Sequence, residues 1–386
     1  MYRRYSLHIL LASVVVLITL GMVMLASTSA YATDGMGENY KGLRQQGMWL
    51  GLGTVICVIV AMTDYHNLRR FFWPFFAVTC VLLILCYLPG IGQRINGEAR
   101  WISAKMLGMN WLRFQPSELA KILVITGMAY MFTKFEGEER KFTKGFFIPG
   151  LVAVIPALLV LFEKDLGSAA TMFSVVFCMM YIAGTHWFYL GSIFALGAAA
   201  LAGLVVMIPN RAVRFLALMD LEAYKMEEGL QQWRALLALG SGGLTGLGLG
   251  NGREKMFYMP YAHTDFIFPM IGEELGAIST LGVVFAFVLF TVCGFAISLN
   301  APDRFGTLLG CGVTSLIAIE AALNIGVTTA MLPNTGLPLP LVSYGGTSMV
   351  CTLACVGILI NIYRQGVDPD LPDIYAVKRR KVTPRI

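Results

Sequence analysis

The chain contains about ten apolar runs of roughly 17–25 residues each, the length at which a helix crosses the hydrocarbon layer of a bilayer. Because a backbone in lipid must satisfy its own hydrogen bonds, such runs are expected to be helices. Hydrophobic residues make up 57% of the 386 residues and charged residues only 13%, which excludes an ordinary soluble domain. The sequence therefore predicts an all-α polytopic membrane protein. The predicted spans are residues 7–28, 47–63, 71–90, 117–134, 146–162, 166–183, 187–208, 270–297, 306–331 and 347–363.

Composition excludes several classes of function. All eight cysteines lie within apolar runs and form no Cys-x-x-Cys pair, which is typical of small buried hydrophobic residues and not of a disulfide framework or a metal site. The four histidines are scattered, so no zinc site is predicted. The chain has no phosphate-binding Walker loop, and nothing in it indicates a nucleic-acid partner.

The ends of the chain indicate its orientation. The basic start at Arg3-Arg4 and the small residues at Ala30-Tyr31-Ala32 would suit a cleaved signal peptide, but the first apolar run is longer than such peptides have. We therefore favour a retained first helix. An even number of spans places both termini on one side, and Arg69-Arg70 and the tail Lys378-Arg379-Arg380-Lys381 make that side cytoplasmic. We predict one integral domain over residues 1–386 of a cytoplasmic (inner) membrane protein, with a large outer loop 209–269 and a cytoplasmic tail 364–386.

Cations on the predicted outer face point to an anionic ligand. The outer loops 91–116 and 209–269 carry several Lys and Arg residues against the usual topological preference. The alternative is that long loops escape this preference, which explains 209–269 well and the shorter 91–116 poorly. The candidate cations are Arg100, Arg214, Arg253 and Lys255.

The richest polar motif lies at the start of the eighth predicted span. His263 and Asp265 precede it, and Glu273 and Glu274 follow within it. Acids at a membrane boundary cost solvation energy, so they usually serve ion passage, proton transfer or chemistry on a substrate. The alternative is that Thr264 or Asp265 caps the nearby helix.

Four other polar stretches stand out. Glu118 and Lys121 are spaced to pair on one helix face, which is more often a structural clasp than a reactive centre. Glu163-Lys164-Asp165 places three charges in a very short outer turn. The Pro- and Gly-rich stretch from Leu332 to Gly346, which includes Ser343, predicts an irregular loop at membrane depth, covered by protein or lining a cavity. The Gly-rich segment 240–252 follows no predicted strand and is interpreted as a flexible loop.

Together these segments resemble the SEDS family of polytopic cell-wall enzymes, whose division and elongation branches are called FtsW and RodA. The ordered motifs that carry the resemblance, which covers nearly the whole chain, are Asn96-Gly97 with Arg100-Trp101, Gln115-Pro116-Ser117-Glu118 with Lys121, Asp165-Leu166-Gly167, Gly240-Ser241-Gly242-Gly243, His263-Thr264-Asp265-Phe266, Glu273-Glu274 and the loop from Pro333 to Gly346.

The resemblance implies a ten-helix fold with a large outer loop between helices seven and eight. It also implies a peptidoglycan glycosyltransferase that polymerises lipid II, an undecaprenyl-diphosphate-linked disaccharide-peptide, on the outer face of the cytoplasmic membrane. A class B penicillin-binding transpeptidase is the implied partner, with other divisome proteins. The run Gly248-Leu249-Gly250-Asn251-Gly252 leading to Lys255 looks more like the division branch, which predicts a septal role in cell division.

The catalytic acid proposed for the family corresponds to Asp265, and the chemistry agrees. A lipid diphosphate is a good leaving group, so the reaction needs one base for the acceptor hydroxyl rather than an acid. Partial desolvation by Phe266 and Phe268 should raise the pKa of Asp265. The departing diphosphate needs positive charge, from the four candidate cations or a bound divalent cation such as Mg²⁺ or Mn²⁺. His263 is a further candidate for substrate binding.

The sequence departs from the family pattern at four positions. Lys164 stands where the family has Pro, which should loosen that turn, and Tyr261 replaces a Glu, which puts metal assistance in doubt. Pro269 predicts a kink four residues past Asp265. Glu320 occupies a position expected to be Gln, which predicts an unpaired acid in the ninth span.

Two other classes of function remain open. A lipid II flippase would use intramembrane charges along a path, and Glu118, Lys121, Glu273, Glu274 and Glu320 could line one. A scaffold would use the charges as helix clasps and the outer loops as docking surfaces. Within the family, an elongation-type polymerase of the RodA branch is the alternative to a septal one.

Overall fold

The computed structural model describes residues 2–29, 40–88, 92–95, 98–103, 113–207, 209–254 and 264–367. Within these residues the chain is nearly all helical, which confirms the predicted fold class. Its elements are α1 (Tyr2–Ser29), α2 (Lys41–Met62), α3 (His66–Arg70), α4 (Phe72–Leu85), β1 (Gly92–Ile95), β2 (Glu98–Ser103), β3 (Arg113–Phe114), α5 (Pro116–Lys134), a π-helical turn η2 (Thr143–Phe147), α6 (Ile148–Phe162), α7 (Leu166–Ala183), α8 (Trp187–Met207), α9 (Pro209–Met219), α10 (Leu230–Gly242), α12 (Ile267–Leu299), α13 (Arg304–Thr328) and α14 (Gly346–Val367).

Each of the predicted spans corresponds to a helix. Seven helices among the described residues are long and apolar enough to cross a membrane, which supports a multi-pass membrane protein: the spans are Tyr5–Thr28, Gly42–Met62, Thr143–Phe162, Leu166–Ala183, Ile267–Leu299, Arg304–Thr328 and Gly346–Gly366. The other three predicted spans coincide with α4, α5 and α8. Of these, α4 has only 14 residues, and α5 carries the charged Glu118 and Lys121 on buried positions.

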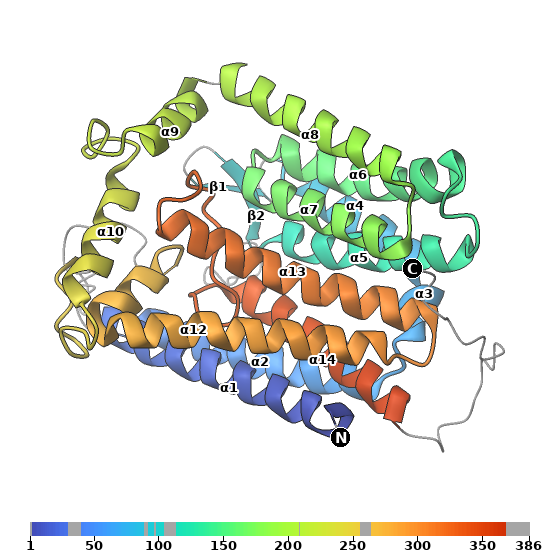
Figure 1. Cartoon of the computed structure of the whole chain (residues 1–386), viewed down its shortest axis with the longest axis horizontal. Helices are drawn as coiled ribbons and strands as arrows, with labels where there is room; N and C mark the ends of the chain where they lie inside the picture. Colours follow the sequence, from blue (N-terminus) through green and yellow to red (C-terminus); the bar gives the residue numbers. More distant parts are fainter. Residues whose placement is uncertain are drawn as a thin grey trace.

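The long helices run along one axis and form a bundle around α13 (Figure 1). α13 packs against α5, α7, α12 and α14, while α1 packs against α12 and α2 against α14. The start of α1 and the end of α14 lie at the same end of the bundle (Figure 1). We call the opposite end, where α12 begins and α13 ends, the site end.

α12 is broken at Gly276 and not at Pro269. Gly276 has φ 79° and ψ 178°, and a Cβ atom there would lie 2.3 Å from the carbonyl oxygen of Leu244, so only glycine fits. The predicted kink at Pro269 is wrong. Because α12 starts at Ile267, Pro269 lies in the first turn, where its missing N–H has no helical partner to lose.

The segments at the site end are more ordered than the sequence predicted. A small antiparallel sheet in the order β1-β2-β3 occupies part of the loop 91–116, a local exception to the all-helical fold. The large segment after α8 contains α9 and α10. The Gly-rich segment is not simply a flexible loop, since Gly240 and Gly242 belong to α10 and the residues that follow are hydrogen-bonded to α12.

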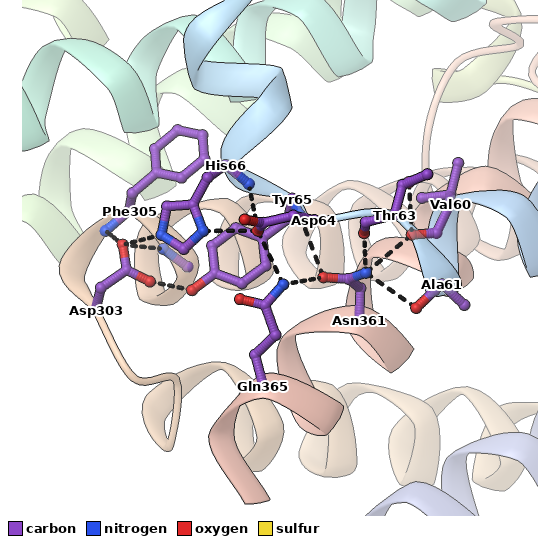
Figure 2. A network of polar contacts seen from close by, with 11 residues as sticks. Val60, Ala61, Thr63, Asp64, Tyr65, His66, Asp303, Phe305, Asn361 and Gln365 are labelled. Atoms are coloured by element: carbon purple, nitrogen blue, oxygen red, sulfur yellow. Dashed lines mark hydrogen bonds and ion pairs between the residues drawn. The ribbon is translucent and has the colours of Figure 1, made fainter. Parts of the chain in front are cut away.

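The other end of the bundle is tied by a polar network that sequence patterns did not indicate (Figure 2). His66 lies between two carboxylates, with Nδ1 2.7 Å from Asp64 Oδ1 and Nε2 3.6 Å from Asp303 Oδ2. The Tyr65 hydroxyl donates to Asp303, and the Asn361 amide donates to the Ala61 carbonyl at 2.9 Å. Burial alone would lower the pKa of His66, but the two carboxylates outweigh it and raise that pKa. These contacts join the ends of α2 and α14 to the start of α13.

Candidate functional site

Asp265 lies in the turn that precedes α12, where two side chains from other segments hold the backbone. Asn324 of α13 donates its amide to the Asp265 carbonyl at 2.8 Å and to the Leu337 carbonyl at 2.7 Å. Ser343 donates its hydroxyl to the Thr264 carbonyl at 2.5 Å. The predicted polar residue Ser343 therefore positions the turn of Asp265 and does not act on it directly.

Asp265 is not a capping residue. The N-cap of α12 is Phe266, which makes no side-chain capping bond, and the Asp265 side chain instead forms a hydrogen bond with Thr264. The capping explanation for this carboxyl group is therefore wrong.

The surroundings of the Asp265 carboxyl group make it a better base than an ordinary aspartate. The residue is partly exposed but closely surrounded by protein, and this burial raises its pKa to about 6. The Thr264 hydrogen bond and the charge of Arg100 oppose that rise, and the charge of Asp165 adds to it. Gly336 lies directly beside the group, because a Cβ atom there would be 3.5 Å from Asp265 Oδ2.

Asp165 connects three segments beside Asp265. It caps α7 by accepting from the Ser168 N–H at 3.1 Å and from the Ser168 hydroxyl at 2.8 Å. It also accepts from the Gln115 amide at 3.2 Å, just before α5. Arg100 of β2 lies 3.7 Å from Asp165 Oδ1 and donates to the Lys164 carbonyl at 2.8 Å. Asp165 is buried, and its contacts join β2, the start of α5 and the start of α7 at the site end.

The backbone at Lys164, where the family has Pro, has a conformation that proline cannot adopt. It has φ 63°, in the left-handed region, whereas proline is fixed at about −65°. The Lys164 N–H also donates to the Leu161 carbonyl at 3.0 Å, a bond that proline lacks. The turn before α7 is thus built differently from a Pro-Asp-Leu-Gly turn, but it is closed by hydrogen bonds rather than loosened.

The irregular loop after α13 is held by α10. Gln232 donates to the Leu332 carbonyl at 2.7 Å, and Asn334 donates to the Gln231 side chain at 2.6 Å. The loop carries Leu337, Leu339, Leu341 and Val342 as buried residues, which confirms a protein-covered loop. Gly336 of this loop lies beside the Asp265 carboxyl group, and Ser343 binds the preceding residue, Thr264.

Glu273 and Glu274 hold the Gly-rich segment to α12. Glu273 Oε1 accepts from the backbone N–H groups of Arg253 and Glu254 at 2.6 and 3.2 Å. Glu274 Oε2 accepts from the Gly250 N–H at 2.8 Å and from the Ser27 hydroxyl of α1 at 2.6 Å. Both carboxylates are buried. Their bonds to the backbone indicate that they fix the segment that leads to Asp265.

Glu320 is not an unpaired acid. It forms a short contact with Lys121, which also lies 2.8 Å from Glu118. All three side chains are buried, and they join α5 to α13. Asn324 lies one helical turn after Glu320 on α13, so this ionic cluster supports the residue that holds Asp265.

The candidate cations are spread over the site end. Among the candidate cations whose side chains the structure describes, Arg100 lies within electrostatic reach of Asp265. Arg214 of α9 pairs with Glu228 at 3.0 Å, and the Arg253 side chain is exposed. Lys255 and His263 lie outside the described residues, so their predicted substrate contacts stay predictions.

Among the described residues, no group of three or more His, Cys, Asp or Glu side chains is placed to hold a metal ion. The carboxylates nearest to Asp265 are engaged, with Asp165 bonded to Ser168 and Gln115. This donor set does not fit a metal centre by itself. The divalent cation therefore stays a prediction.

Comparisons with known proteins agree with this architecture. A family model for cell cycle proteins, FtsW/RodA/SpoVE, matches residues 7–367. The probable peptidoglycan glycosyltransferase FtsW of Geobacter metallireducens is 38% identical over 361 residues, which cover 93% of this chain and 95% of that protein. The stage V sporulation protein E of Bacillus subtilis is 34% identical over 353 residues, covering 90% of this chain and 94% of that protein.

Solved structures show the same fold. A chain from a peptidoglycan synthase complex described as coordinating polymerization and crosslinking superposes with a TM-score of 0.76 at 25% identity, covering 93% of this chain and 98% of that one. The rod shape determining protein RodA of Thermus thermophilus gives a TM-score of 0.67 at 27% identity, covering 93% and 97%. The chain therefore belongs to the FtsW/RodA/SpoVE family of cell cycle proteins.

Proposed function

We propose that this protein is a peptidoglycan glycosyltransferase that polymerises lipid II into glycan strands at the outer face of the cytoplasmic membrane. The observation that carries the proposal is Asp265, a carboxyl group of raised pKa at the site end, whose backbone turn is held by Asn324 and Ser343. The names of its relatives supply the reaction, since several are probable peptidoglycan glycosyltransferases.

Asp265 acts as the general base in this reaction. The acceptor hydroxyl oxygen forms a bond to the anomeric carbon of the donor sugar, while the bond from that carbon to the lipid diphosphate breaks. The proton passes to the Asp265 carboxylate, and the electron pair leaves with the diphosphate oxygen. A pKa of about 6 leaves the group ionised near pH 7 and still basic enough to accept the proton.

Arg100 supplies positive charge for the diphosphate. Its guanidinium lies within electrostatic reach of Asp265 and donates to the Lys164 carbonyl in the turn before α7. The exposed Arg253 and the predicted cation Lys255 precede the same base along the chain.

A Mg²⁺ or Mn²⁺ ion brought by the substrate would add to this positive charge. Excess chelator should then slow polymerisation, and added Mg²⁺ or Mn²⁺ should restore it.

The pKa of Asp265 predicts the acid limb of the pH profile. The polymerisation rate should fall about tenfold for each pH unit below a pKa of about 6, because only the ionised group accepts a proton. Initial rates on lipid II between pH 4.5 and 7.5 test this, with unfolding monitored in parallel. A rate that stays constant down to pH 4.5 in folded protein would contradict the assignment of this base.

A class B penicillin-binding transpeptidase and other divisome proteins are the proposed partners. The similarity to a chain from a peptidoglycan synthase complex supports a crosslinking partner. The names of the FtsW relatives support a septal role over the elongation role of RodA.

If the role is septal, depletion of the protein should give filaments of undivided cells. Rounded or swollen cells would assign it to elongation.

A further inference from the structure

Glu163 is a buried carboxyl group with no strong partner. It ends α6 as the C-cap residue, and its exposed fraction is 1%. Among the described residues neither of its oxygens has a hydrogen-bond partner beyond a weak contact with the Cys86 thiol. An unpaired charge in such a place is costly, so this position favours the uncharged acid. The mechanism above makes no use of it.

The neighbours of Glu163 place it in the same charged group as Asp265. Arg100 and Asp165 lie within its electrostatic reach, and Cys86 and Tyr87 face it from the end of α4. The next residue, Lys164, points its side chain to the exterior. Burial and then the charge of Asp165 raise the pKa of Glu163 to about 8, against the opposing Cys86 contact and Arg100 charge.

The charge of the Arg100 guanidinium acts on three carboxyl groups here. Arg100 lies 3.7 Å from Asp165, and its charge also acts on Asp265 and on Glu163. When Glu163 is uncharged, Arg100 faces two carboxylates. When Glu163 ionises, a third negative charge appears in a poorly solvated region, where charges are weakly screened. Such a change weakens the attraction of this region for an anion.

We propose that Glu163 governs anion binding beside Asp265. When Glu163 is uncharged, the Arg100 guanidinium is able to bind a diphosphate group. When Glu163 is ionised, it attracts the Arg100 guanidinium itself and so weakens diphosphate binding. Glu163 is a positioning residue in this scheme, because it acts through Arg100. The identity of the anion as the diphosphate of lipid II rests on the proposed function.

The test is the affinity of the purified full-length protein for lipid II in detergent between pH 7 and 9.5. If binding requires uncharged Glu163, wild-type affinity should fall about tenfold per pH unit above the pKa of that group. Glu163→Gln keeps the size and polarity of the uncharged acid but has no proton to lose. Its affinity should therefore stay nearly constant across the same range.

Two control variants separate Glu163 from its titratable neighbours. Cys86→Ser and Tyr87→Phe should each keep the alkaline loss of affinity. Flat wild-type binding, or an alkaline loss that persists in folded Glu163→Gln protein, would overturn the inference. Should Glu163→Gln fail to fold, Glu163→Asp replaces it and should move the pH of the loss, since it retains a carboxyl group in an altered position. Loss of affinity as predicted but no polymerisation would refute the proposed function and leave this inference standing.

Discussion

Asp265→Asn protein is expected to fold, insert and bind lipid II, but to polymerise it about 10²–10⁴-fold more slowly than wild type, because the amide cannot accept a proton. The backbone bonds that hold this turn come from Asn324 and Ser343, so they survive the substitution. Because its surroundings raise the pKa of Asp265 above the ordinary value, the ionised group costs folding free energy at neutral pH. Its removal should leave thermal stability unchanged or raised. The measurement is glycan polymerisation by purified protein, with a thermal melt on the same sample.

Asp265→Glu is the matched control. It keeps the carboxyl group but moves it by one methylene, so it should recover little activity, because reactive geometry is demanding. Near-normal polymerisation by well-folded Asp265→Asn protein would remove Asp265 from the mechanism.

Lys121→Met is expected to cause the largest loss of stability, about 3–5 kcal/mol, because it leaves two buried carboxyl groups without their cation. Lys121 contacts both Glu118 and Glu320, and its exposed fraction is 3%. Thermal or denaturant unfolding in detergent measures the loss. Polymerisation should fall with it, because the cluster supports the helix that carries Asn324.

Two variants control for this effect. Glu320→Gln introduces the residue expected in the family and leaves Lys121 paired with Glu118 at 2.8 Å, so it should cost far less. Adding Glu118→Gln and Glu320→Gln to Lys121→Met removes the uncompensated charges and should recover much of the stability. Equal stability of Lys121→Met and wild type would show that the cluster does not hold α5 to α13.

The helices and the catalytic candidate could be predicted from the sequence because each depends on local signals. Apolar runs of bilayer length predicted every long helix. Asp265 stood out because an acid at the edge of such a run is costly without a use. Glu118 and Lys121 were predicted as a pair from their spacing, and the structure confirms that pair.

The support of the site could not be predicted, because it joins residues far apart in the chain. Asn324 lies 59 residues from Asp265, and nothing around it in an apolar helix indicates its partner. Glu320 and Lys121 lie 199 residues apart, so Glu320 looked unpaired. The break in α12 was misplaced for a related reason. Gly276 is required by Leu244 of a neighbouring segment, whereas Pro269 is harmless in a first turn.

The positions of the charges bear on the flippase alternative. Glu118, Lys121 and Glu320 are bonded to one another, and Glu273 and Glu274 to the backbone of the Gly-rich segment. Charged side chains with such fixed partners act more readily as structural contacts than as residues that guide lipid II across the membrane. The scaffold alternative explains these contacts but gives no reason for the raised pKa of Asp265.

The most direct test of the account is the fate of labelled lipid II offered to the purified protein in liposomes, with and without a candidate class B transpeptidase. The account predicts glycan strands from wild-type protein, and lipid II that stays unpolymerised with Asp265→Asn. Translocation of lipid II without strand synthesis, or neither process in protein that binds lipid II, would contradict it.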